Sequence, residues 1–184
     1  ALEVALAEAK EEARKALVLL REERHKNADI IAQALHRELQ DLGMEKSRIQ
    51  FAIEDTDELT ALGAQSIELV FSANLGEQLM ALHKVASGGE LARIALAFKS
   101  VFSNHSLKTL VFDEIDVGIS GDIALKVAEK IQALSTSNQV FCITHLPQTA
   151  SIGVHHYHLE KHVEEGRTVS TIKKLSEEEH LSHI

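Results

Sequence analysis

The segment from residue 107 to residue 144 contains two short apolar runs separated by a helical stretch, and this pattern constrains the fold more than any other. The runs span residues 107–112 and 139–144, and the helix between them is predicted over residues 121–134. A strand, a helix and a second strand at this spacing form a βαβ unit, which requires a parallel sheet. Because both runs are continuously apolar, we expect these strands to be buried on both faces.

The first 42 residues predict one long helix, because they contain no Gly or Pro and are rich in strong helix formers. Apolar residues at heptad spacing form a seam in its first half: Leu2, Leu6, Ala9, Ala13, Ala16 and Leu20. Such a seam favours a coiled coil, although one face of an ordinary amphipathic helix gives the same pattern. A second apolar face follows from Ile30 to Leu42. We therefore expect residues 1–25 to end a coiled-coil arm and Gly43 to cap the helix.

The remaining elements follow from local patterns in a chain of 184 residues that is 45% apolar, enough for one domain with an appendage. They are strands at 48–53 and 66–73 around an acidic, turn-rich loop at 54–63, a turn at 74–77, a helix at 87–103, and a hairpin of 154–162 with 167–174. With the βαβ unit, they predict an α/β domain over residues 26–184.

Composition excludes several classes of protein. A single cysteine, Cys142, rules out an internal disulfide and favours a reducing, cytoplasmic compartment. The formal net charge of −9 does not indicate a basic surface for nucleic acid. Contact with DNA would therefore need a local basic patch or another part of the protein. No apolar run reaches the roughly 18–20 residues of a membrane span, so no membrane partner is expected. The chain begins at Ala1 rather than Met, and we expect it to be a fragment.

An acidic pair follows the first apolar strand. Asp113 and Glu114 end the run that begins at Leu110. Ligands bind at the carboxyl ends of strands in open α/β sheets. One carboxylate there can hold Mg²⁺ through water, and a second can activate a water for attack on a phosphoryl group. Two solvated acids at a strand end are the alternative.

The helix predicted from residue 87 opens with Ser87, Gly88, Gly89 and Glu90. Ser87 and Glu90 have the spacing of a capping box, which explains both without any ligand. The capping box does not explain two consecutive glycines, each of which costs about 1 kcal/mol of helix propensity. Glycines at a helix N-terminus allow a phosphate to approach the exposed amides, so these four residues are candidate nucleotide contacts.

His145 follows the second apolar strand and completes an ordered set of motifs. A single histidine is more often structural, but the order of the Ser-Gly-Gly-Glu helix, the acidic strand end and His145 resembles the C-terminal half of an ABC-type ATPase head. The resemblance implies that Ser87 to Leu91 is the signature motif and that residues 110–114 are Walker B. It also implies that Asp113 is the Mg²⁺ acid, Glu114 the catalytic base, Asp116 the D-loop acid and His145 the switch histidine.

Within that superfamily the chain most resembles the RecN family of bacterial SMC-like DNA repair ATPases. The stretches that carry the resemblance are residues 84–93, 112–121 and 144–148, and a weaker likeness runs from about residue 26 to the terminal hairpin. It implies an α/β fold, namely the C-terminal lobe of the head with a mainly parallel sheet flanked by helices, preceded by a coiled-coil helix. It also implies an ATP- and Mg²⁺-dependent, nucleoid-associated protein that acts in recombinational repair of DNA double-strand breaks.

The chain departs from a complete head in one respect. A Walker A motif needs a Gly followed by Lys, and none of the nine glycines is followed by Lys. We therefore expect the N-terminal lobe with Walker A to lie outside this chain, and the chain alone to be inactive. The resemblance implies a head–head homodimer in which Ser87 contacts the nucleotide of the opposing head in trans, whereas Glu114 and His145 act in cis.

Two interpretations remain open for how the intact protein uses ATP. In the first, continuous ATP hydrolysis drives repair. In the second, the chain belongs to another SMC-type protein that acts as an ATP-gated DNA tether or clamp. Closure of its heads bridges DNA, and hydrolysis only resets the clamp. A transporter ATPase subunit is a third possibility that no feature of the sequence supports.

Overall fold

The computed structural model describes residues 2–102 and 108–183. These residues form two compact units, the first of residues 2–87 with 97–102 and the second of residues 88–96 with 108–183. The first contains α1 (Leu2–Asp41), β1 (Arg48–Thr60), β2 (Gly63–Ser72), β3 (Met80–Ala81) and α2 (Leu82–Val85). Helix α3 (Gly88–Val101) contributes to both. The second continues with β4 (Thr109–Phe112), α4 (Gly121–Ser135), β5 (Gln139–Cys142), α5 (Pro147–Ala150), β6 (Tyr157–Glu164), β7 (Arg167–Lys174) and α6 (Glu177–His183).

The long N-terminal helix is confirmed as α1, and it ends at the predicted glycine. Gly43 has φ +76°, a conformation that favours glycine. Its N–H donates to the Gln40 carbonyl (3.2 Å), and the Met44 N–H donates to the Leu39 carbonyl (2.9 Å). This pair of hydrogen bonds is a Schellman motif, which satisfies carbonyl groups at the helix end.

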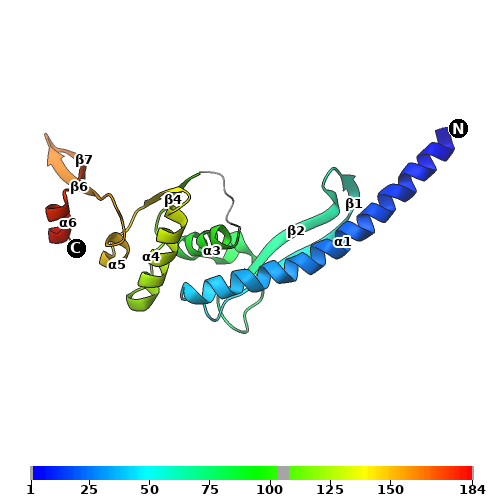
Figure 1. The fold of residues 1–184 in the computed structure, drawn as a ribbon, viewed down its shortest axis with the longest axis horizontal. Helices are drawn as coiled ribbons and strands as arrows, with labels where there is room; N and C mark the ends of the chain where they lie inside the picture. Colours follow the sequence, from blue (N-terminus) through cyan, green and yellow to red (C-terminus); the bar gives the residue numbers. More distant parts are fainter. Residues whose placement is uncertain (1, 103–107, 184) are drawn as a thin grey trace. The chain divides into compact units, whose positions relative to one another are not determined.

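The β1–β2 hairpin corrects the prediction of a loop over residues 54–63. Both strands continue through this region, β1 to Thr60 and β2 from Gly63, and the register shifts between Asp55 and Thr60. The hairpin lies along α1 (Figure 1). Arg21 pairs with Asp55 (2.9 Å), and Arg24 donates to the Leu62 carbonyl and to Gln65. These contacts with the helix, together with the backbone hydrogen bonds of the hairpin, keep an acidic segment extended.

The core of the first unit lies at the C-terminal end of α1. Its buried apolar side chains are Leu35, Leu39, Leu42, Met44, Ile49, Phe71 and Ala97. In contrast, Leu2, Leu6 and Leu20 of the heptad seam are exposed. The seam therefore has no partner helix within the parts of the chain that the structure describes. In the same parts, no helix combines the length and the hydropathy of a bilayer span.

The predicted βαβ unit is confirmed in the second unit. Strands β4 and β5 pair in parallel, with Phe112 opposite Cys142, and α4 connects them. The α4 face that packs on the core is formed by Ala124, Val127, Ala128, Ile131 and Leu134. The β4–β5 pair is the only parallel sheet of the described residues, because β1–β2–β3 and β6–β7 are antiparallel.

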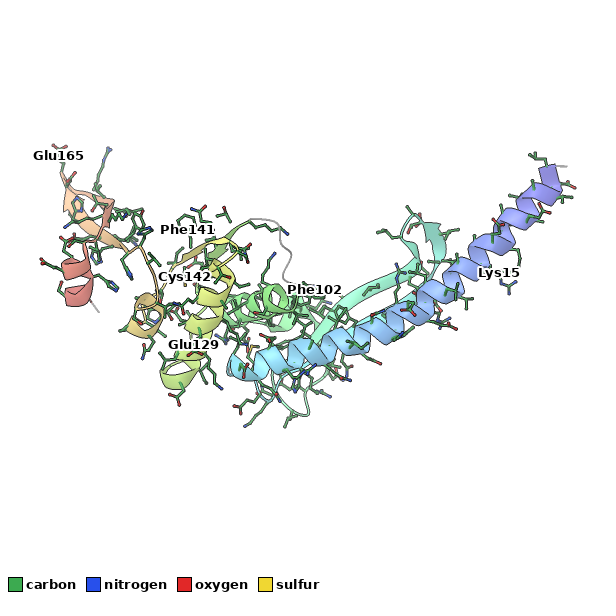
Figure 2. All side chains as sticks on the ribbon, in the orientation of Figure 1. Lys15, Phe102, Glu129, Phe141, Cys142 and Glu165 are labelled. Carbon is green, nitrogen blue, oxygen red and sulfur yellow. The ribbon has the colours of Figure 1, made fainter. Side chains whose placement is uncertain are left out.

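The expected burial of β4 and β5 on both faces is wrong for this chain. Val111, Phe141 and Ile143 expose 63%, 47% and 58% of their surface. Phe141 and Cys142, both labelled in Figure 2, are consecutive on β5 and therefore lie on opposite faces. Phe112 is buried on its face of the sheet, whereas Phe141 leaves about half of its surface exposed.

The tail forms the predicted hairpin. Strands β6 and β7 are joined by Glu165 and Gly166, which both have positive φ (48° and 77°). Positive φ at both central residues is the signature of a type I′ turn, whose twist matches that of the strands. Helix α6 is tied to β7 by an ion pair between Lys173 and Glu179.

Candidate functional site

The predicted acidic and histidine residues meet at the carboxyl ends of two neighbouring strands. The Ile143 N–H donates to the Phe112 carbonyl (2.9 Å), so the β4–β5 pairing extends to the point where both strands end. Asp113 and Glu114 follow β4 directly and are exposed. His145 follows β5 by three residues and is also exposed. The parallel register therefore places all three side chains at one edge of the sheet.

Asp116 links the two strand ends. Its carboxylate is 1% exposed. The Thr144 hydroxyl donates a short hydrogen bond to its Oδ2, and the other oxygen lies 3.6 Å from Nδ1 of His145. The Thr144 hydroxyl also accepts from the Leu146 N–H (3.0 Å), which fixes the backbone on the C-terminal side of His145. The buried carboxylate of Asp116 therefore lies next to the exposed imidazole of His145.

Glu114 stands in an unusual backbone conformation. Its φ is +56°, in the left-handed region that disfavours residues other than glycine. It opens a tight turn, because the Val117 N–H donates to the Glu114 carbonyl (3.1 Å). Such strain costs on the order of 1–3 kcal/mol and persists only where surrounding contacts enforce it. The direction in which the Glu114 side chain leaves the backbone is therefore set by the turn over residues 114–117.

The glycines of α3 pack against this turn. A Cβ added to Gly89 would lie 3.1 Å from the carbonyl oxygens of both Glu114 and Val117. A Cβ added to Gly88 would lie 2.6 Å from the carboxylate oxygen Oε2 of Glu114. Close packing is thus a second reason for the two glycines, besides the access to backbone amides that the sequence suggested.

The two glycines should respond differently to substitution. Gly89→Ala is expected to destabilise the fold by about 1–3 kcal/mol, because its new methyl group meets fixed backbone oxygens. Gly88→Ala meets only the end of a flexible side chain, so the helix propensity of alanine, up to about 1 kcal/mol, favours it. The midpoint of urea unfolding measures both effects. Equal midpoints for the two variants would contradict the packing of Gly89 on the turn.

Arg93 is a functional candidate that the sequence analysis did not identify. It follows Gly89 by one helical turn and is 7% exposed. Its Nη1 donates to the carbonyl oxygens of Ile115 (3.3 Å) and Val117 (3.0 Å). Burial lowers the pKa of Arg93 from its ordinary value, while the nearby Glu90 raises it. An arginine next to Ile94, on the buried side of α3, is the sequence signal that could have revealed it.

Ser87 and Glu90 flank the two glycines as predicted. Ser87 is the exposed residue immediately before α3, and Glu90 lies half-buried in the first turn of the helix. Both side chains take part in interactions within the chain. The capping box and the nucleotide contact therefore remain alternative explanations for these two residues.

The strand ends carry a negative potential. Burial raises the pKa of the Cys142 thiol to about 11, and the carboxylates of Asp116 and Asp113 add to the effect. A thiol with so high a pKa is a poor nucleophile near neutral pH. The described residues contain no group of three or more His, Cys, Asp or Glu side chains placed to hold a metal ion. An exposed carboxylate such as Asp113 fits Mg²⁺, which keeps several waters and needs only one or two protein ligands.

Comparisons with known proteins identify relatives of this chain. No family model matches it. It is similar to the DNA repair protein RecN of Bacillus subtilis, with 40% identity over 170 residues, covering 84% of this chain and 30% of the relative. It is also similar to RecN of Deinococcus radiodurans, with 42% identity over 161 residues, covering 88% and 28%. The chain thus spans less than a third of these relatives.

Two solved structures are also similar to this chain. One is the Smc head domain with a coiled coil and joint from Pyrococcus yayanosii, with 22% identity and a TM-score of 0.56 over 98% of this chain and 35% of that one. The other is the Smc head domain with an extended coiled coil, bound to the C-terminal domain of ScpA, from Pyrococcus furiosus, with 19% identity and a TM-score of 0.52 over 98% and 46%. They confirm the predicted fold, an α/β lobe of an SMC-type head with a long N-terminal helix.

Proposed function

Because the chain belongs to the RecN family of DNA repair proteins, we propose that it supplies half of the ATP site in the head of an SMC-like ATPase. The intact protein would hydrolyse ATP with Mg²⁺ and act in recombinational repair of DNA double-strand breaks. In this proposal residues 1–25 end the coiled-coil arm, and residues 26–184 form the C-terminal lobe of the head.

One observation carries the proposal. Asp113, Glu114 and His145 lie together at the carboxyl ends of two parallel strands, the place where open α/β sheets bind ligands. The N-terminus of α3 lies close to Glu114, and its first residue, Gly88, is exposed and has no side chain, which suits the approach of a phosphate. An acidic pair and an imidazole are groups that suit phosphoryl transfer to water, whereas the N-terminus of α3 would serve the nucleotide of the opposing head.

Each residue has a defined part in the proposed reaction. Asp113 would hold Mg²⁺ through water, and the ion would neutralise charge on the phosphates. Glu114 would orient the attacking water and accept its proton. His145, oriented by Asp116, would donate a hydrogen bond to the terminal phosphate. Ser87, with Gly88 to Glu90, would contact the nucleotide bound to the opposing head.

The proposal requires partners outside this chain. The sequence has no Walker A motif, and the RecN relatives are long enough to hold a second lobe and the rest of the arm. The partners are therefore the lobe that carries Walker A, a second head of the same kind, and DNA bound by the intact protein.

A mixing experiment tests the shared site. In the full-length protein, Glu114→Gln removes the base in cis, and Ser87→Arg blocks the nucleotide of the opposing head in trans. Each variant alone should lack ATP turnover, since both sites of its dimer are damaged. A mixed dimer keeps one intact site. If protomers exchange freely and the sites are independent, an equal mixture recovers about a quarter of wild-type turnover.

The outcomes separate the alternatives. No recovery in a mixture that forms mixed dimers would contradict the contribution of Ser87 in trans. Turnover without Mg²⁺ would contradict the role of Asp113. If the Glu114→Gln protein holds ATP as a dimer and still bridges two DNA molecules, closure rather than turnover is the output.

A further inference from the structure

Arg93 makes contacts that the proposed reaction does not use. Its guanidinium is buried inside the second unit, and Nη1 is shared by the carbonyl oxygens of Ile115 and Val117. Its Nε is buried and has no hydrogen-bond partner among the described residues. Removing a cation from water is costly unless the cation is compensated. Because the backbone carbonyls of Ile115 and Val117 compensate the buried cation, Arg93 stabilises the backbone conformation that holds these carbonyls in place.

That backbone conformation is the turn that holds Glu114. Gly89 packs on the carbonyl oxygens of Glu114 and Val117, and Arg93 bonds those of Ile115 and Val117. Gly89 and Arg93 are four residues apart, so they lie on the same side of α3. The carbonyl oxygens of residues 114, 115 and 117 therefore all contact one face of this helix. These contacts help to enforce the positive φ of Glu114.

We propose that Arg93 is a positioning residue that ties the turn over residues 114–117 to helix α3 and thereby sets the placement of the Glu114 carboxylate. The inference rests on the proposed function, in which Glu114 is the base and the N-terminus of α3 contacts the opposing nucleotide.

Two substitutions separate this role from general stability. Arg93→Met keeps an unbranched side chain of similar length but leaves the carbonyl oxygens of residues 115 and 117 without their donor. Arg93→Lys keeps a cation but loses the fork of donors. The matched control is Ile94→Val, because Ile94 is the next residue, is 2% exposed and loses only a methyl group.

The experiment uses the full-length protein and two readouts. Steady-state kinetics give kcat and KM for ATP, and amide hydrogen exchange gives protection over residues 114–119, where the N–H groups of Val117 and Ile119 bond within the turn. For Arg93→Met we expect kcat to fall about 10- to 100-fold with KM unchanged, because the base is misplaced and binding is not. Exchange at the turn should rise about tenfold or more. Arg93→Lys should lie between it and wild type.

The remaining results overturn the inference. It fails if Arg93→Met leaves exchange at the turn unchanged, or if kcat falls no more than in Ile94→Val. If Arg93→Met changes kcat and KM together and loses protection in β4 and β5, the second unit has unfolded, and Arg93→Lys then decides. The inference fails unless Arg93→Lys lowers kcat while the protection of β4 and β5 is unchanged. If the wild-type protein shows no turnover, the proposed function fails, while the exchange rates still decide whether Arg93 holds the turn.

Discussion

Replacing Glu114 with Gln is expected to lower kcat for ATP by about 10²–10⁴-fold, the usual contribution of a general base. The amide has nearly the shape of the carboxylate, so the packing against Gly88 and the strained turn should persist. It cannot accept a proton from water. Nucleotide binding should therefore remain, and the ATP-bound dimer should accumulate. Steady-state turnover together with equilibrium binding of ATP measures both effects.

The chain offers a matched control for this substitution. Glu165 is also an exposed glutamate with positive φ (48°), but it lies in the β6–β7 turn. Glu165→Gln makes the same chemical change in a similar backbone conformation, so it should leave turnover unchanged. If Glu114→Gln and Glu165→Gln have equal turnover, Glu114 is not the base.

Replacing Phe71 with Ala is expected to cost about 3–5 kcal/mol of folding free energy, because it leaves a large cavity in the core. Phe71 is fully buried in β2, opposite Ile49 of β1 and Met80 of β3. The loss would shift the urea midpoint without changing the m-value. Ile67→Ala on the same strand is the control, since Ile67 is 48% exposed and should cost far less. Equal shifts for the two variants would show that Phe71 is not at the core of the first unit.

Much of the fold could be predicted because it depends on local periodicity. The helix ending before Gly43 and the βαβ unit follow from spacing and from the places where glycine stands. The continuation of β1 through residues 54–60 could not be predicted, because that segment is acidic and resembles a loop. Its extended form depends on pairing with β2 and on Arg21 of α1, which is 34 positions away from Asp55 in the sequence. Contacts over such separations leave no local pattern.

The candidate site was predictable only in part, for a related reason. Sequence order places Asp113, Glu114 and His145 at strand ends, since parallel strands carry their carboxyl ends to the same edge. The burial of Asp116 under His145 depends on a side-chain contact with Thr144, which spacing does not reveal. The arginine on the buried side of α3 marks Arg93 itself, but the sequence does not show what it contacts, because backbone carbonyls carry no residue identity.

The hairpin that lies along α1 has a mechanical consequence. Arg21 and Arg24 attach the helix to Asp55, Leu62 and Gln65, and Gly63 allows the turn to approach Leu20 closely. From Arg21 toward its C-terminus, α1 is attached to the hairpin, so the helix and the hairpin resist bending together. The described part of α1 before Arg21 has no such polar contact with the hairpin. A sideways load on this part is therefore expected to bend α1 on the N-terminal side of Arg21, and a twist about the helix axis is expected to be transmitted to β1 and β2.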